Sequence, residues 1–236
     1  MSGKLLLGGV LGLLLAWPGI GFAHPHILVS QVTRFIEKDG FFVAVETSWR
    51  FDPAASEFEI VVADTDKDGK LSAREVKPLG ELALNELKSF GYLIWFRIDG
   101  KDQRPTLKPS FDARIADPAE FVPEGWAPVP DKDGKLPPQA RPDPLQGAVT
   151  LKDRKPRRMR NLVYVLRHEL PKPVKTLSLS VLDPEDYIRL VVDEKTPVLK
   201  GPNDQATCVV DKHPTLKSDY FPGNPHVADR ITCRLP

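Results

Sequence analysis

The sequence has few cysteines and no excess of charge of either sign. Cys208 and Cys233 are its only cysteines, and 33 basic residues stand against 32 acidic ones. A chain without a basic excess is not attracted to polyanions, so we expect no nucleic-acid partner. A nucleophile elbow, a glycine-rich phosphate loop and an HExxH motif are also missing, and we therefore predict no enzyme.

Long apolar runs are scarce too. The N-terminal run from Leu5 to Trp17 ends at Pro18 and is shorter than the roughly 20 apolar residues that a bilayer crossing needs. It follows Lys4 and leads to small residues before Ala23, which is typical of a secretory signal, with a retained anchor as the alternative. We predict cleavage after Ala23 (signal 1–23), no membrane insertion afterwards, and a periplasmic or secreted protein.

An exported chain with two cysteines favours a disulfide over a metal pair or a catalytic thiol. Cys208 and Cys233 would then close a loop near the C-terminus. Closing a loop of this length contributes about 3 to 4 kcal/mol in the chain-entropy model. We predict that this bridge orders the tail.

The remaining pattern predicts a mostly β (α+β), β-sandwich-like fold in one domain, 24–236. An opening hairpin is expected over 26–51, with a turn at Lys38 to Gly40, and helical periodicity follows at about 53–90, interrupted at Pro78 and Gly80. Proline enrichment between 104 and 160 predicts a long loop, densest at about 116–147. Further strands are expected at 92–98, 162–166, 176–182, 188–192, 208–210 and 231–235.

Residues 64–75 read DTDKDGKLSARE, the pattern of a calcium-binding EF-hand loop. Short carboxylates stand at positions 1, 3 and 5, Gly69 takes the sharp turn at position 6, and a bidentate glutamate closes position 12. Asp52 and Pro53 predict a capped helix before the loop. The expected calcium ligands are Asp64, Asp66, Asp68, Lys70 through its backbone carbonyl, Ser72 and Glu75.

The loop has no second copy with which to pair. The segment Asp131 to Gly134 places Val129 and Ala140 where the first and last ligands would fall. A lone exported loop is expected to bind Ca²⁺ with a dissociation constant of roughly 0.1 to 1 mM. Structural support is therefore a more plausible role for calcium than signalling.

Cleavage after Ala23 would leave an N-terminus that begins His24, Pro25, His26. An α-amine and two imidazoles suit Ni²⁺, Co²⁺, Zn²⁺ or Cu²⁺ far better than Ca²⁺. Pro25 has no amide proton, so a square-planar site through that amide is disfavoured. The alternatives are a chelate of His24 and His26 completed by another residue, or histidines that merely follow the cleavage site. His213 and His226 could complete it but are expected at the surface, and His168 is expected to be structural.

Several segments together resemble the DUF1007 family, which is often described as periplasmic components of uncharacterised transport systems. They are AHPH at 23–26, TSWRFD at 47–52, DTDKDGKLSAREV at 64–76, FGYLIWFRIDG at 90–100 and VLDPEDYIRL at 181–190. The resemblance implies transition-metal handling beside an inner-membrane metal permease. It also singles out Asp183, as a metal-site residue or a turn residue before Pro184, and Tyr187.

The leading hypothesis is a periplasmic calcium-binding accessory protein that binds a transition metal for an uptake or transport system. The alternative is a calcium-stabilised envelope interaction protein without a transition-metal role. A third hypothesis is a copper-dependent or hydrolytic enzyme built on the His24 amine. The sequence shows no second convergent catalytic group that would support it.

Overall fold

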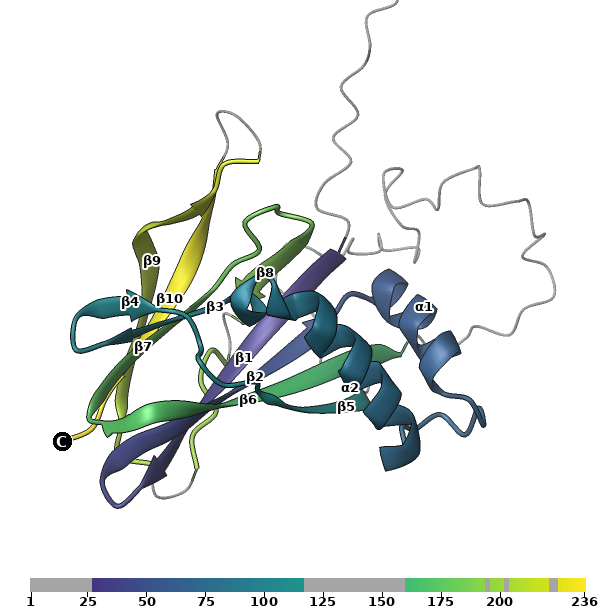
Figure 1. Ribbon diagram of the computed structural model, residues 1–236, viewed down its shortest axis with the longest axis horizontal. Coiled ribbons are helices and arrows are strands. Elements are labelled where there is room, and N and C mark those ends of the chain that lie inside the picture. The colour runs from purple at the N-terminus through teal and green to yellow at the C-terminus, as the bar shows by residue number, and fades with distance from the viewer. Residues whose placement is uncertain (1–26, 117–159, 194–195, 202–203, 221–224) are drawn as a thin grey trace, which may run out of the picture.

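The computed structural model describes residues 27–116, 160–193, 196–201, 204–220 and 225–236. The signal segment, His24, His26 and residues 117–147 of the proline-rich segment lie outside the described residues. Ten strands form two five-stranded sheets, and a helix pair packs beside them (Figure 1). Within the described part of the chain, no helix is long and apolar enough to cross a membrane.

The first sheet has the strand order β5-β6-β2-β1-β8. Its neighbours are antiparallel except for β1 and β8, which run parallel. The predicted opening hairpin is confirmed, because Asp39 and Gly40 turn the chain with φ of 53° and 75°. The strands are β1 (Ile27–Lys38), β2 (Phe41–Phe51), β5 (Ser110–Ala116), β6 (Asn161–Val174) and β8 (Ile188–Val192).

The second sheet has the order β4-β3-β7-β10-β9. A disulfide joins Cys208 and Cys233, which face each other across β9 and β10, so the predicted bridge is confirmed. The strands are β3 (Ile94–Ile98), β4 (Lys101–Gln103), β7 (Thr176–Val181), β9 (Thr207–Ser218) and β10 (His226–Arg234). The prediction of a mostly β fold is confirmed.

Several boundaries differ from those expected. The strands β6, β9 and β10 are longer than predicted, and two further differences change how the chain is organised. Residues 110–116 were assigned to the proline-rich loop but form β5, which pairs with β6 along its whole length. The strand expected from Tyr92 starts at Ile94, because the 3-10 turn η1 (Gly91–Leu93) holds Tyr92 and Leu93 at positive φ. Pairing with a distant strand and a tight turn before it are features that local composition does not reveal.

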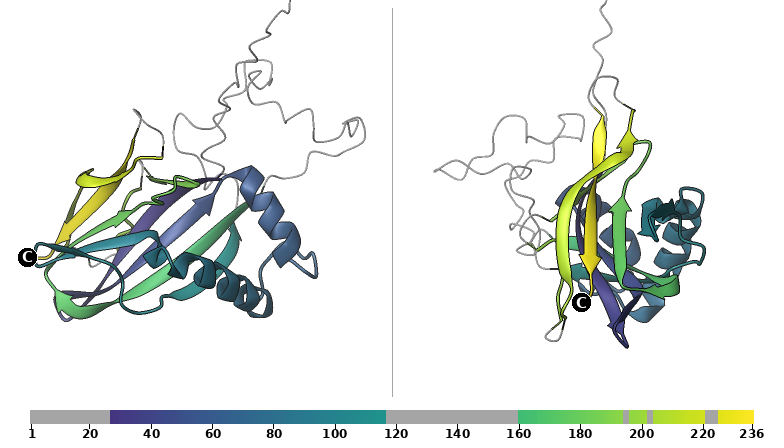
Figure 2. Two further views of the ribbon diagram at one scale, coloured as in Figure 1. Left: turned by 45° about the horizontal axis from the view of Figure 1, so that its top comes forward. Right: turned by 90° about the vertical axis from the view of Figure 1, so that its left-hand side faces the viewer.

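The helices α1 (Pro53–Ala63) and α2 (Ala73–Lys88) follow β2 and lie against β6 and β5 respectively (Figures 1 and 2). Asp52 caps α1 as expected, accepting hydrogen bonds from the backbone N–H groups of Ala54 and Ala55. Its other oxygen accepts from the N–H of Leu28 at 2.9 Å, so the start of α1 is tied to β1.

The pattern at Pro78 and Gly80 left two short helices or one kinked helix as alternatives, and two helices is wrong, since α2 runs through both residues. A Cβ at Gly80 would lie 2.5 Å from the ring of Phe111 on β5. The glycine therefore allows a close approach of helix and sheet rather than ending the helix.

One apolar core joins both sheets and both helices, with Trp49, Ile60 and Phe96 among its fully buried members. His168 also lies in this core, with its ring centroid 5.9 Å from those of Tyr92 and Phe96. Burial lowers the pKa of His168 to about 4, so the ring is neutral at pH 7. The prediction that His168 is structural agrees with this position.

Candidate metal centre

The loop between α1 and α2, residues 64–75, brings three carboxylates together. Asp64, Asp66 and Asp68 each offer an oxygen, and these oxygens lie within 4.8 Å of one another. Asp64 directly follows α1 and is buried, whereas the other two are exposed. Gly69 turns the chain with φ of 84°, which a residue with a side chain rarely adopts.

Backbone hydrogen bonds orient these side chains. The N–H of Gly69 donates to Asp64 Oδ2 at 3.1 Å, that of Asp68 to Asp66 Oδ1 at 3.1 Å, and that of Lys70 to Asp68 Oδ1 at 2.8 Å. Each carboxylate thus has one oxygen bound to the loop's own backbone. The bonds to Asp66 and Asp68 are Asx turns, and the three bonds together fix the loop without using every acceptor.

The second oxygen of Asp64 provides a test of whether the loop suits a cation. Asp64 Oδ1 is buried and has no hydrogen-bond partner among the described residues. A buried carboxylate oxygen without a partner is costly, and a cation beside it would remove that cost. Three converging carboxylates are the donors that hard cations such as Ca²⁺ take, so the residues fit calcium.

Glu75 is placed differently from the three aspartates. Its Oε1 accepts from the N–H and hydroxyl of Thr65, both at 2.7 Å, and its Oε2 accepts from the N–H and hydroxyl of Ser72 at 2.9 and 2.8 Å. These bonds, the one from the Ser72 N–H foremost, lower the pKa of Glu75 to about 2. Ser72 and Glu75 therefore cap α2, and a bidentate contact from Glu75 to a cation would require some of these bonds to open.

Arg160 lies beside the acidic loop, a neighbour that sequence reasoning missed. Its Nη1 lies 3.3 Å from Asp64 Oδ2, and the same atom lies 3.7 Å from where a Cβ on Gly69 would be. Arg160 is 96 residues away from Asp64 in the chain, so no local pattern marks it. A guanidinium beside the loop partly neutralises the buried carboxylate and would also repel a cation bound there.

The replacement Arg160→Gln is expected to strengthen calcium binding about fivefold, because it removes this repulsion. The same change should lower the melting temperature in EDTA, because Asp64 loses its ion-pair partner. Calorimetric titration with calcium and thermal unfolding in EDTA measure the two effects. Arg167→Gln, which breaks an exposed pair with Glu169, is the control. Unchanged calcium affinity in Arg160→Gln would contradict the expectation.

The other residues weighed for a metal site are tied into turns or strands. Asp183 accepts from the N–H groups of Glu185 and Ile188, both at 2.9 Å, as a turn residue does. His213 and His226 were expected at the surface, which is wrong, because they lie on β9 and β10 and are largely buried. Strand pairing across the disulfide-closed loop explains this burial.

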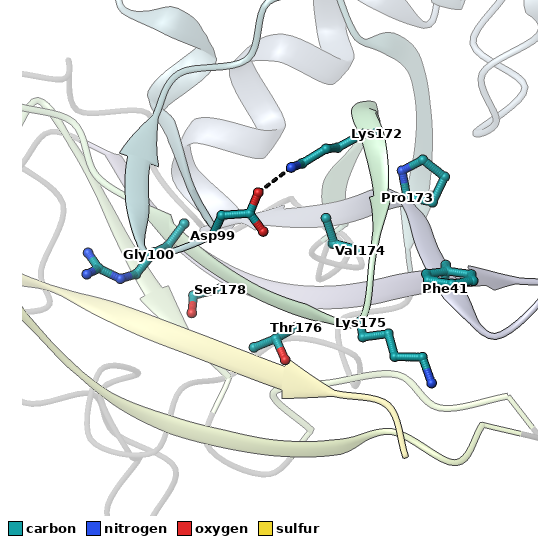
Figure 3. A pocket seen from close by; sticks show the side chains of 10 residues that line it. Phe41, Asp99, Gly100, Lys172, Pro173, Val174, Lys175, Thr176 and Ser178 are labelled. Atoms are coloured by element: carbon teal, nitrogen blue, oxygen red, sulfur yellow. Dashed lines mark hydrogen bonds and ion pairs between the residues drawn. The ribbon is translucent and has the colours of Figure 1, made fainter.

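An open cleft of about 520 Å³, lined by both polar and apolar side chains, lies between the β3–β4 and β6–β7 connections (Figure 3). The basic side chains that line the cleft already have partners. Lys172 pairs with Asp99, and Arg97 pairs with Asp102 at 2.9 Å. Lys175 donates a hydrogen bond to the carbonyl oxygen of Pro236 at 2.7 Å. Among its described lining residues no nucleophile stands beside a base. The cleft supports no catalytic assignment.

Fold and loop together define a class: a two-sheet β protein with an acidic helix–loop–helix between β2 and β3. The chain belongs to the DUF1007 family, described as "Protein of unknown function", whose model matches residues 9–220. The resemblance drawn from the sequence motifs is thereby confirmed. The search of curated proteins and the search of solved structures gave no match.

Proposed function

We propose that this protein is a periplasmic calcium-binding accessory protein that binds a transition metal for an uptake or transport system. The calcium part rests on the convergence of Asp64, Asp66 and Asp68, together with a buried Asp64 oxygen that has no partner among the described residues. The disulfide between β9 and β10 supports an oxidising compartment. An inner-membrane metal permease is the proposed partner, and no catalytic role is proposed.

Calcium would be held by the side chains of Asp64, Asp66 and Asp68, with the Lys70 carbonyl, Ser72 and Glu75 as further donors. The bound ion supplies positive charge that neutralises the acidic loop. With a dissociation constant of roughly 0.1 to 1 mM, millimolar calcium would add about 0.4 to 1.4 kcal/mol of stability. This role is structural, because the loop joins the two helices that pack on the first sheet.

The transition metal would be held by His24 and His26, with the α-amine freed by cleavage as a further nitrogen ligand. Support comes from the nitrogen donors themselves, an α-amine and two imidazoles within three residues, which suit these metals. The N–H of Ile27 donates to the carbonyl of Tyr187 at 3.2 Å. The strand β1, which follows the AHPH segment in the chain, is therefore joined at its first residue to the DPEDY segment.

The processed, calcium-saturated protein is expected to bind one equivalent of Ni²⁺, Zn²⁺ or Cu²⁺, and His24→Ala is expected to abolish that binding. A chelate of amine and imidazole loses its ring ligand in this variant. Calorimetric titration with each metal measures it. Adding one residue before His24 is a second variant that moves the amine but keeps both rings, and it should also weaken binding. Unchanged affinity in His24→Ala would refute the site.

A calcium-stabilised interaction protein without a transition-metal role remains the second candidate. It is favoured by the apolar side chains that α1 exposes, since Phe58, Val61 and Val62 are each more than half exposed. Binding of a partner at normal affinity by His24→Ala protein would distinguish this role from metal delivery.

A further inference from the structure

An open apolar groove of about 490 Å³ lies between α1, α2 and the strands beneath them. Apolar and aromatic side chains dominate its lining, which includes Trp49, Phe51, Leu79, Leu87, Tyr164 and Tyr187. None of its lining residues belongs to the loop 64–75, so the groove is separate from the metal centre proposed above. A concave apolar surface of this size suits the side chains of a ligand or partner.

The rim of the groove is apolar as well. Phe58 on α1 and Leu82 on α2 line it and are 72% and 58% exposed. Val61 and Val62 lie three and four residues after Phe58, so they continue the same face of α1. Contiguous exposed apolar surface of this kind marks interaction sites in proteins.

Two carboxylates also line the groove, Glu59 on α1 and Glu86 on α2. Burial, and secondly the charge of Glu86, raises the pKa of Glu59. Burial and the charges of both glutamates raise the pKa of Tyr164 as well. Two carboxylates and a phenol therefore line the same groove, and a positive charge bound there would relieve the repulsion between the carboxylates.

Trp49 supplies an independent observation. Its side chain lines the groove and is almost completely buried, yet its Nε1–H has no hydrogen-bond partner among the described residues. Buried donors of this kind are normally satisfied. The groove thus combines apolar walls with negative charge, and one of its wall residues holds an unsatisfied buried donor.

We propose that this groove docks a segment of a partner protein that presents apolar side chains beside lysine or arginine. The apolar side chains would fill the space between α1 and α2, and the basic group would lie between Glu59 and Glu86. Charge complementarity selects this occupant over an acidic or purely apolar one. Because the calcium loop contributes no lining residue, the docking does not rest on the proposed calcium site.

The test uses the full processed protein and a fluorescent amphipathic helix built of leucine and lysine, with a leucine–glutamate helix as the comparison probe. Anisotropy at low salt, in calcium and in EDTA, should show binding of the leucine–lysine probe alone. Leu82→Glu should abolish binding. The double variant Glu59→Gln with Glu86→Gln should weaken it about tenfold.

Glu81→Gln is the matched control, because Glu81 is an exposed carboxylate of α2 that does not line the groove. Circular dichroism verifies that each variant keeps its fold. Equal binding of both probes, or full binding by Leu82→Glu, would overturn the proposal. Self-association lost in Leu82→Glu would assign the groove to a second copy, and probe binding seen only after deletion of residues 117–147 would assign it to that segment. Either result would likewise overturn the proposal.

Discussion

Replacing Asp66 and Asp68 together by asparagine is expected to weaken calcium binding by about 100-fold or more, since affinity in such loops follows the number of charged ligands. Asparagine keeps a side-chain oxygen that can still accept the hydrogen bonds from the N–H groups of Asp68 and Lys70. The loop geometry is therefore preserved and only charge is lost. Calorimetric titration with calcium provides the measurement.

The control for this variant is Glu37→Gln, which removes an exposed carboxylate from β1, far along the chain from the loop. In the parent and the control, millimolar calcium should raise the melting temperature, because it adds about 0.4 to 1.4 kcal/mol of stability. The double variant should show no rise. A rise of the same size in the double variant would exclude the loop as the calcium site.

Acidification from pH 7 to pH 4.5 is expected to cost the folded protein roughly 2 to 3 kcal/mol through His168 alone. The unfolded imidazole has a pKa near 6.5, while burial lowers the folded value to about 4. Below pH 6.5 the unfolded chain binds a proton that the folded core excludes. Stability is therefore complete above pH 6.5, falls between pH 6.5 and 4, and changes no further through this group below pH 4.

His168→Leu removes the titrating group and also two ring nitrogens that have no hydrogen-bond partner among the described residues. The loss of unfolding free energy between pH 7 and 4.5 should be smaller in this variant by roughly 2 to 3 kcal/mol, the contribution of His168. Urea unfolding in EDTA at both pH values measures it. Leu166→Met changes the same strand and core without altering titration, so it should keep the parental pH dependence. An unaltered pH dependence in His168→Leu would show that the ring gains a proton without unfolding.

Some features were predicted correctly because short-range contacts decide them. The Asp52 cap, the Asp39–Gly40 turn and the clustering of the acidic loop each depend on residues within a few positions of one another. The disulfide was predicted from the expected export of the chain and from its two cysteines, which allow one pairing. The prediction for Glu75 was less complete, because its hydrogen bonds to Thr65 and Ser72 compete with a ligand role.

Other features were not predicted, because they depend on segments far apart in the chain. The strand β5 was missed beside a proline-rich segment, although pairing with β6 stabilises it. Gly80 suggested a helix break, whereas its function is to admit the ring of Phe111. His213 and His226 were assigned to the surface, although the pairing of β9 with β10 buries them.

The sequence by itself determined the spacing of the loop carboxylates, the caps and hairpin turns, the two-cysteine bridge and the mostly β character of the chain. These follow from the chemistry of neighbouring residues. Only the tertiary structure brought Arg160 to Asp64 and paired β8 with β1 in parallel, and only it placed Glu59 and Glu86 in one apolar groove. Burial and long-range contact energies decide these features, because they exist only once distant segments pack against one another.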